Sequence, residues 1–489
     1  MRSTRWWPAA VMLLWMCGCN CGNPDSPDGG TGGGSATGGG SATGGGSATG
    51  GGSATGGGSA TGGGSATGGG SSTGDCAWSA SLGVGISTQL NDVLALADGT
   101  VIVVGISTGT LPDGGGTGAY VTRLDGSGRI MWQRGYGTGA QLTRAVRSLD
   151  GELLVAGYAN AGGNACSNHH GARDVLLLKV RLQNGDPLLQ TCIGGDDDDE
   201  PTDLRELVHP TLGTVIHLTG STDSHSSFDV GPKHGGGGFD SPDLMNAVVS
   251  SEADGGLRVR VACIGSNGPE TGAGFLDDGS PFGSTFGDNS GDLAGNPDPQ
   301  FSDLMHVEFV DGGLCTELSC TVRARRIGGA ANDGVTRVAP GNRIIGQTRS
   351  NDAGTNPAGF ACPGASQTSP VPYLARVSGA ALTDLRCLTG TTGPQTNGVD
   401  LDATDGGLWV TVSSPPSDGD FANPDITYDA GAGNTDTALL QVDATLQTKL
   451  RSLRLRGVRV VALAVRPDGC LVAVGPGSNG RAPVFAIQP

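Results

Sequence analysis

The chain has 489 residues, 90 of them glycine, and its 47 Asp and Glu against 29 Lys and Arg give a formal net charge of −18. A chain this acidic repels phosphate backbones and anionic lipid headgroups, so we expect neither a nucleic-acid partner nor electrostatic binding to a membrane. Length alone does not fix the number of domains, because β-rich repeat folds often use several hundred residues as one unit.

The first segment, "MRSTRWWPAAVMLLWMCGCN" (1–20), has two arginines, a short apolar run, and then small residues and cysteines. The apolar run is too short to span a bilayer as a helix and is typical of an export signal. "MCGCN" (16–20) resembles the lipobox of bacterial lipoproteins, with Gly18 directly before Cys19. The resemblance implies a signal peptide over 1–19, a lipid on Cys19, and anchoring at the bacterial outer membrane or cell surface. Lipidation of Cys17 and ordinary secretion are the alternatives.

Seven hexapeptides follow between Gly32 and Thr73, six of them "GGGSAT" and the last "GGGSST". Without charge or bulky side chains, this tract cannot offset its conformational entropy by burial. We therefore expect a flexible, disordered linker over 20–75. Its length either sets a stand-off distance for a folded domain or has no particular role.

From Cys76 onward, one short pattern recurs at intervals of about sixty residues. It consists of a strand, an Asp-Gly or similar pair, and in the clearest copies an apolar run that ends in glycine. Asp-Gly tolerates the positive φ of a tight turn, and the apolar run is typical of a strand buried on both faces, so each copy predicts a β-hairpin. The seven copies span 94–107, 146–159, 206–222, 274–287, 335–350, 400–414 and 463–477.

A second predicted hairpin follows each of the first six copies, after a variable loop rich in Gly, Asp and Ser. These hairpins span 119–137, 174–195, 246–266, 304–329, 372–390 and 438–457. Four strands per repeat are typical of a β-propeller blade. The fourth repeat is the poorest match, because Pro281 and its Gly and Ser neighbours are weak strand formers.

The two ends of the repeat region complete each other. "APVFAIQP" (482–489) supplies a third strand without a fourth, and "CAWSASLG" (76–83) reads as a fourth strand without the first three. Pairing them closes a ring and removes a free sheet edge. The sequence therefore predicts an all-β, seven-bladed β-propeller over 76–489, closed by its N-terminal strand, with Leu82 buried beside the last strand.

The repeats resemble bacterial β-propeller repeats of the SBBP type, best in "MWQRGYG" (131–137) and "LVAGYA" (154–159). The resemblance covers 76–489 and implies an extracellular propeller. It implies a fold rather than an activity, so function has to be argued from a site.

Nine cysteines lie beyond the leader, in a chain expected to be exported to a compartment where disulfides persist. Equivalent places in the second and fifth repeats predict the bridges Cys166–Cys192 and Cys362–Cys387. Cys315 and Cys320 flank one hairpin turn and are a third candidate pair. Cys76 and Cys470 both belong to the composite last blade, where a bridge would lock the ring. Cys263 is then left over.

Two motifs invite a chemical reading. "GISTG" (105–109) has the spacing of a nucleophile elbow around Ser107, but no helix is expected after it, as that motif requires. "CSNHH" (166–170) brings Cys166, His169 and His170 together as metal ligands, and the competing reading is a disulfide cysteine beside two loop histidines. We favour the second reading, and no catalytic set stands out.

Acidic segments raise the question of calcium. "GGDDDDEPTD" (194–203) could offer Asp196 to Glu200 and Asp203 as oxygen ligands, but it lacks the spacing and turn glycine of a calcium loop, which favours a solvated acidic turn. The insertions 287–303 and 417–436 are interpreted in the same way. We expect no cofactor, with calcium as the alternative.

The sequence thus favours a surface-anchored binding or scaffolding module for an unidentified extracellular protein or glycan. The alternative is an extracellular hydrolase or lyase with its site in the central channel. An enzyme should gather ionisable side chains at one mouth of the channel, whereas a binding module should show a loop surface without such convergence.

Overall fold

The computed structural model describes most of the chain from Cys76 onward. The described residues are 76–82, 88–109, 117–224, 241–252, 256–266, 268–286, 302–309, 322–329, 331–351, 361–366, 368–379, 381–388, 397–404, 407–413, 419–429, 435–476 and 482–489. They form β-strands and one short 3₁₀ helix, η2 (Gly419–Phe421). None of these residues belongs to a helix long and apolar enough to cross a membrane.

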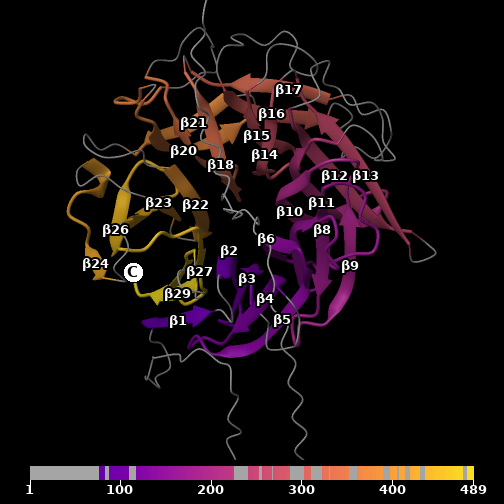
Figure 1. Cartoon of the computed structure of the whole chain (residues 1–489). Helices are drawn as coiled ribbons and strands as arrows, with labels where there is room; N and C mark the ends of the chain where they lie inside the picture. Colours follow the sequence, from indigo (N-terminus) through magenta and orange to yellow (C-terminus); the bar gives the residue numbers. More distant parts are fainter. Residues whose placement is uncertain are drawn as a thin grey trace, which may run out of the picture. The chain divides into compact units, whose positions relative to one another are not determined.

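Seven sheets, each built from four antiparallel strands, are arranged in a ring, and each sheet forms one blade (Figure 1). Blade 1 contains β2 (Thr88–Ala95), β3 (Val101–Ser107), β4 (Gly118–Leu124) and β5 (Ile130–Thr138). Blade 2 contains β6 (Ala140–Arg147), β7 (Leu153–Asn160), β8 (Arg173–Val180) and β9 (Pro187–Ile193). Blade 3 contains β10 (Asp199–His209), β11 (Gly213–Thr222), β12 (Asp243–Ser251) and β13 (Leu257–Ile264).

The remaining blades follow the same order. Blade 4 contains β14 (Glu270–Phe275), β15 (Pro281–Thr285), β16 (Asp303–Phe309) and β17 (Val322–Ile327). Blade 5 contains β18 (Asp333–Ala339), β19 (Arg343–Thr348), β20 (Val371–Ser378) and β21 (Ala381–Cys387). Blade 6 contains β22 (Asn397–Thr404), β23 (Gly407–Ser413), β25 (Thr437–Val442) and β26 (Lys449–Arg456), and blade 7 contains β27 (Ala462–Val465), β28 (Leu471–Val474), β29 (Ala482–Ile487) and β1 (Trp78–Leu82). The predicted seven-bladed propeller is confirmed, including the weakly patterned fourth repeat.

Blade 6 has one strand that the sequence did not predict. β24 (Ile426–Asp429) lies parallel to β26 and covers its outer edge. It comes from the acidic insertion 417–436, whose residues 419–421 form η2, so part of this insertion is ordered structure rather than a solvated loop. Asp420 of η2 pairs with Arg386 of blade 5 at 2.6 Å, which ties the insertion to the neighbouring blade.

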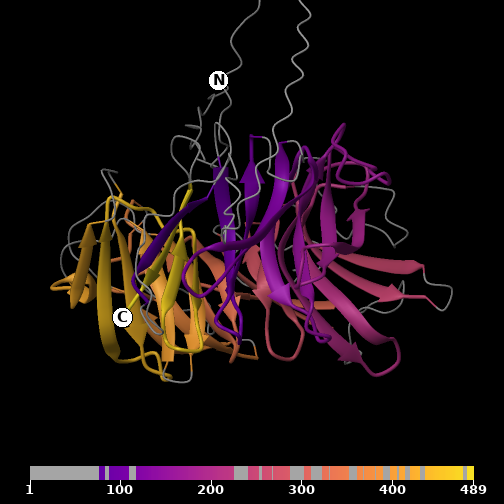
Figure 2. The same ribbon diagram turned by 90° about the horizontal axis from the view of Figure 1, so that it is seen from below.

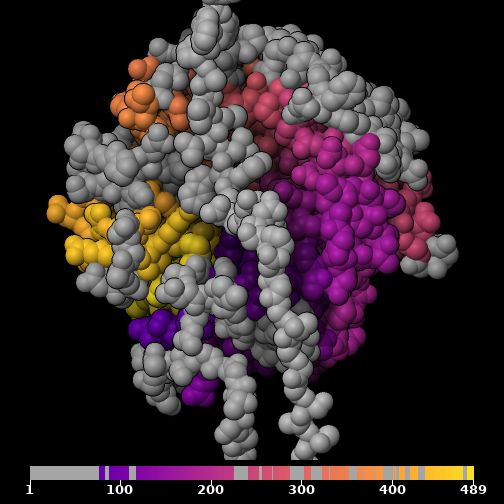
Figure 3. Space-filling model, in the orientation of Figure 1, coloured from indigo at the N-terminus to yellow at the C-terminus, as the bar shows by residue number. Residues whose placement is uncertain are grey.

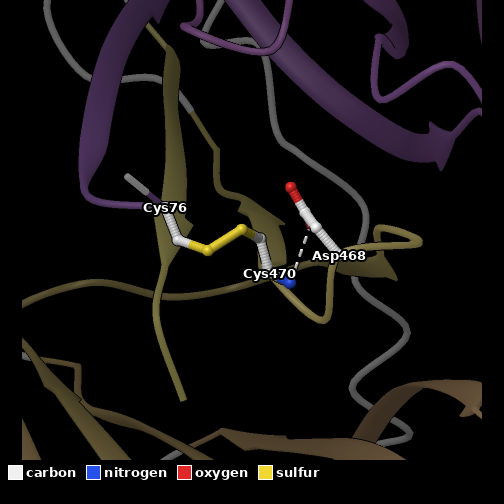
Figure 4. Close-up of side chains that lie close together, drawn as sticks. All are labelled: Cys76, Asp468 and Cys470. Carbon is white, nitrogen blue, oxygen red and sulfur yellow. Dashed lines mark hydrogen bonds between the residues drawn. A yellow bond between two sulfur atoms is a disulfide. The ribbon is translucent and has the colours of Figure 1, made fainter. Parts of the chain in front are cut away.

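The ring closes as predicted. β1 pairs antiparallel with β29, with Trp78 opposite Ala486 and Leu82 opposite Ala482, and Leu82 is 2% exposed. The C-terminal blade therefore lies directly against the indigo N-terminal strand (Figure 3). A disulfide between Cys76 and Cys470 joins the same two ends of the domain (Figure 4). The fourth strand of blade 7 is thus supplied from the other end of the repeat region.

A tryptophan of the fourth strand packs against the next blade in two places. A side chain at Gly128 of blade 1 would meet the Trp78 ring within 2.4 Å, and one at Gly185 of blade 2 would meet Trp132 within 2.9 Å. Both glycines have positive φ in the turn between the third and fourth strands. Glycine is required there both by the backbone conformation and by the close approach of the indole ring.

Tight turns occupy one side of the ring, which we call the turn face. It is formed by the connections between first and second strands and between third and fourth strands (Figure 2). Hydrogen bonds join neighbouring blades at this level all the way around: Arg466–Gly126, Arg123–Leu182, Leu149–Glu206, Arg205–Leu276, Gly341–Asp277, Arg376–Ala444 and Arg451–Pro489. The opposite side, where the longer loops lie, is the loop face.

Candidate functional site in the central channel

The inner strands of blades 1 to 6 each contain a β-bulge at the corresponding place. The register shifts lie at Leu90/Asp92, Leu142/Arg144, Pro201/Asp203, Gly272/Gly274, Val335/Arg337 and Gly398/Asp400. A bulge bends its strand and redirects the following side chain. Five of the six residues that follow the bulges are charged, and the sixth is Gly274.

These five charged residues form one hydrogen-bonded and ion-paired group, which we call the channel network. Arg144 lies between two carboxylates: its Nε is 2.8 Å from Asp203 Oδ1, and its Nη1 is 3.2 Å from Asp92 Oδ2. Arg337 also lies between two carboxylates, with Nη2 3.2 Å from Asp92 Oδ1 and Nε 3.1 Å from Asp400 Oδ1. Negative and positive side chains therefore alternate along the network, in the order Asp203, Arg144, Asp92, Arg337 and Asp400.

The network crosses the channel. Asp92 belongs to blade 1 and Arg337 to blade 5, and these blades are not neighbours in the ring (Figure 1). Their side chains can meet only at the centre. The channel is therefore occupied at this level by protein side chains.

Burial and pairing control the electrostatics of the network. Asp92 is 1% exposed, and burial raises its pKa, although Arg144 and the backbone N–H of Ala145, 2.8 Å away, stabilise the ionised carboxylate. Burial likewise raises the pKa of Asp203, opposed by Arg144. Three carboxylates against two guanidiniums leave the ionised network with a net charge of −1 (−3 + 2).

This group was not predicted from the sequence, because its members are separated by up to 308 residues (400 − 92) and belong to no motif. A signal was nevertheless present. "QLND" (89–92) and "QLTR" (141–144) align Asp92 with Arg144 in consecutive repeats, at the same place before the turn. Alternation of charge at one repeat position predicts contact at the axis of a ring.

The nucleophile-elbow reading of Ser107 is not supported. Ser107 ends the buried strand β3, is 1% exposed, and has its Oγ 3.5 Å from Thr88 Oγ1. The next described element is the strand β4, whereas an elbow serine precedes a helix.

The cysteine and histidine motif at 166–170 is a structural loop. Cys166 is bonded to Cys192, so its sulfur is not available as a metal ligand. His169 has its Nε2 2.8 Å from the carbonyl oxygen of Ala159 and its Nδ1 3.7 Å from Asp174 Oδ2. His170 is exposed. These contacts agree with the disulfide reading of the motif.

The acidic run at 194–203 does not form a single solvated turn, which corrects that interpretation. Asp196 and Asp197 are exposed, but β10 begins at Asp199, which is fully buried. Asp199 Oδ2 accepts hydrogen bonds from Gly195 N at 2.8 Å and Ser224 Oγ at 2.9 Å. Asp203 belongs to the channel network. The strand separates the carboxylates instead of gathering them around an ion.

Asp199 has counterparts in the next two blades. Glu270 begins β14 and accepts hydrogen bonds from Ser266 Oγ at 2.6 Å and Thr285 Oγ1 at 2.7 Å. Asp333 begins β18 and accepts from Gly329 N at 2.7 Å and Ser350 Oγ at 3.0 Å. Burial raises the pKa of Asp199 to about 6, of Glu270 to about 7 and of Asp333 to about 6. We call these three side chains the seam carboxyls.

Among the described residues, one group of three potential metal ligands lies within 4.8 Å of one another: Cys76, Asp468 and Cys470 (Figure 4). The two sulfurs are bonded to each other. Asp468 accepts a hydrogen bond from Cys470 N at 3.1 Å and pairs with Arg466 at 2.7 Å. The group therefore contains the disulfide that closes the ring, and its two sulfurs are not available as metal ligands.

The structure contains three of the four expected disulfides: Cys76–Cys470, Cys166–Cys192 and Cys362–Cys387. Cys263 lies half-buried in β13 and takes part in none of them. The fourth pair, Cys315 and Cys320, lies outside the described residues, as do the lipidation candidate Cys19 and most of the acidic insertion 287–303.

Comparison with known proteins does not identify a family. No family model and no curated protein matches the chain. Solved structures that resemble it include a protein from Lactobacillus plantarum, with 13% identity over 76% of this chain and 88% of that one and a TM-score of 0.39. The WD40 propeller domain of Doa1 has 10% identity over 84% and 96%, with a TM-score of 0.33. The NanB sialidase of Streptococcus pneumoniae has 10% identity over 83% and 70%, with a TM-score of 0.35.

Proposed function

We propose that this chain is an exported, lipid-anchored surface protein whose propeller is a binding or scaffolding module for an extracellular protein or glycan. The observation that carries the proposal is the state of the channel network. Each of its five ionisable side chains forms an ion pair with another member, so we assign the network a role in stabilising the ring. Binding of a partner then falls to the surface loops on the two faces of the ring.

The sequence supplies the anchoring part of the proposal. From the lipobox-like "MCGCN" we propose a lipid on Cys19, with residues 20–75 as the linker to the propeller. The similarity of "MWQRGYG" (131–137) and "LVAGYA" (154–159) to SBBP repeats supports the repeat type. We therefore propose an SBBP-type surface lipoprotein at the bacterial outer membrane or cell surface.

Photo-crosslinking on intact cells tests the binding function. A photoreactive residue in place of His170, which is exposed on the loop face, should yield discrete adducts with a protein or glycan. The same residue in place of Val208, which is 71% exposed at the turn face on the opposite side of the ring, is the matched control. Absence of adducts from His170, Asp196 and Asp197 alike would contradict binding through this part of the loop face.

A hydrolase or lyase in the channel is the second candidate. One observation favours it: the channel does gather carboxyls of raised pKa, Asp92 and Asp203, beside two arginines. Turnover of an extracellular polysaccharide that Asp203→Asn abolishes, while the loop-face residues remain dispensable, would support this candidate over the first.

A further inference from the structure

Exposed large apolar side chains gather on the turn face. Eight such side chains occur among the described residues, and seven lie in turn-face turns or at the strand ends that meet them. The seven are Ile130, Met131, Leu149, Leu188, Val208, Leu257 and Leu450, with exposed fractions from 36% to 71%. The eighth, Phe286, follows β15 on the loop face and is 42% exposed.

Exposed arginines are distributed in the same way. Seven arginines are exposed within the described part of the chain, and six lie at the turn face: Arg129, Arg147, Arg181, Arg258, Arg323 and Arg451. Arg129 precedes Ile130, Arg258 follows Leu257, and Arg451 follows Leu450. Apolar side chains flanked by arginines suit the interface of a bilayer, where the apolar group inserts and the guanidinium stays at the headgroups.

The turn face is not strongly charged, in contrast to the chain as a whole. Its described turns also expose six carboxylates: Asp98, Asp150, Glu252, Asp277, Asp278 and Asp468. Among the described residues, these carboxylates equal the six exposed arginines in number, so their formal charges cancel. The expectation that this acidic chain stays off a membrane follows from its total charge and does not apply to this face. A near-neutral apolar face matches zwitterionic headgroups.

The described domain begins on the same face. Cys76 is bonded to Cys470, which directly follows the blade 7 turn containing Asp468 (Figure 4). Trp78 packs on Gly128, in a turn of blade 1 on the same side. The preceding 75 residues therefore join the propeller at the turn face. If Cys19 carries a lipid, as in the proposed function on which this step rests, the anchor pulls this face toward the bilayer.

We propose that the turn face docks on a zwitterionic phospholipid surface. The apolar side chains come from blades 1, 2, 3 and 6, so they form a rim rather than one patch. A flat surface contacts such a rim all at once, whereas a small ligand or a groove-bound peptide would reach only one or two of its members. The loop face then points away from the membrane, toward extracellular partners.

Vesicle sedimentation tests the docking without the lipid anchor. Full-length Cys19→Ala protein should co-sediment with vesicles of equal parts phosphatidylcholine and phosphatidylethanolamine. Adding Ile130→Ser, Met131→Ser, Leu149→Ser and Val208→Ser should weaken partitioning by about tenfold or more. Because these side chains are about half exposed or more, the substitutions should leave the melting temperature of the protein unchanged.

Phe286→Ser is the matched control, because it removes an exposed apolar side chain from the opposite face. It should leave partitioning unchanged. Failure of the Cys19→Ala protein to bind vesicles, or an equal loss in Phe286→Ser, would overturn the docking proposal. Because the protein is unlipidated, this result does not depend on whether Cys19 is an anchor, which a mass measurement decides separately.

Discussion

Arg337 and Asp92 meet across the centre of the ring, with Arg337 Nη2 3.2 Å from Asp92 Oδ1. The two residues are 245 positions apart and belong to blades that are not adjacent. Contacts at blade seams join only neighbours, so this pair links distant blades directly. The same pair occupies the space in which a propeller enzyme would bind its substrate.

Removing Arg337 should destabilise the fold strongly. Arg337→Ala leaves Asp92 and Asp400, which are 1% and 2% exposed, without a shared counter-ion. Breaking a buried ion pair in this way typically costs about 3 to 5 kcal/mol. Denaturant unfolding should show that loss, and Arg456→Ala, at an exposed arginine, should cost less than about 0.5 kcal/mol. Equal stabilities of the two variants would show that the channel network contributes little.

Breaking the ring closure should be more harmful than breaking a local loop. Cys76→Ser with Cys470→Ser removes a link over 394 residues, whereas Cys362→Ser with Cys387→Ser removes one over 25. A loss of about 2 to 5 kcal/mol is expected for the first pair and a smaller one for the second. Light scattering should also show association of the first variant, because an opened seam exposes strand edges. The reverse order of stabilities would contradict closure by this bridge.

His217 and Asn246 should show strong coupling in a double-mutant cycle. Both are buried in blade 3, with His217 Nε2 2.5 Å from Asn246 Oδ1, while His217 Nδ1 and Asn246 Nδ2 have no hydrogen-bond partner among the described residues. Asn246→Leu alone should cost about 1 to 3 kcal/mol, because it leaves the imidazole unpaired. The double variant His217→Leu/Asn246→Leu should recover most of that loss. Additive effects would count against the pairing.

The seam carboxyls should stabilise the folded domain more in mild acid than in mild base. Burial raises the folded-state pKa of Asp199 to about 6, of Glu270 to about 7 and of Asp333 to about 6, above unfolded values near 4. A carboxyl with a raised folded-state pKa stabilises fully below its unfolded pKa and loses that contribution as pH rises through the folded pKa.

Between pH 5 and pH 8, the free energy of unfolding should therefore fall by roughly 3 to 5 kcal/mol from these seam carboxyls. Urea unfolding at the two pH values measures the change. Glu270→Gln should flatten the profile around pH 7, whereas Asp443→Asn, at an exposed turn where hydrogen bonds lower the carboxyl pKa to about 2, should not. Because burial lowers the pKa of His217 and His306, which act in the opposite direction, the comparison with Glu270→Gln is decisive. An identical profile in Glu270→Gln would show that the Glu270 carboxyl is ionised in the fold.

The sequence predicts the blades because their determinants are local. Asp98 and Gly99 form a turn in which Asp98 Oδ1 accepts the Thr100 N–H at 3.0 Å and Gly99 has a φ of 79°. The apolar run of β3 is buried along almost its whole length. Closure by 76–82 was predictable as well, since an unpaired third strand requires a fourth.

The channel network and the seam carboxyls were not predicted, because both depend on how blades meet. Asp203 and Asp199 lie in one acidic run, yet Asp203 pairs with Arg144 in the channel, whereas Asp199 accepts a hydrogen bond from Gly195 in the connection between blades 2 and 3. Their neighbours Asp196 and Asp197 remain exposed. A run of similar residues does not reveal which of its members a strand will bury. The burial of each carboxylate depends on where β10 begins and on its register with β11.

Intact-mass analysis of the chain extracted from the membranes of the producing cell is the most direct test of the proposed surface anchoring. We expect a polypeptide that begins at Cys19 and carries acyl chains, and a Cys19→Ala protein that lacks the added acyl mass. A mature chain cleaved elsewhere, without added lipid mass, would contradict the anchored module.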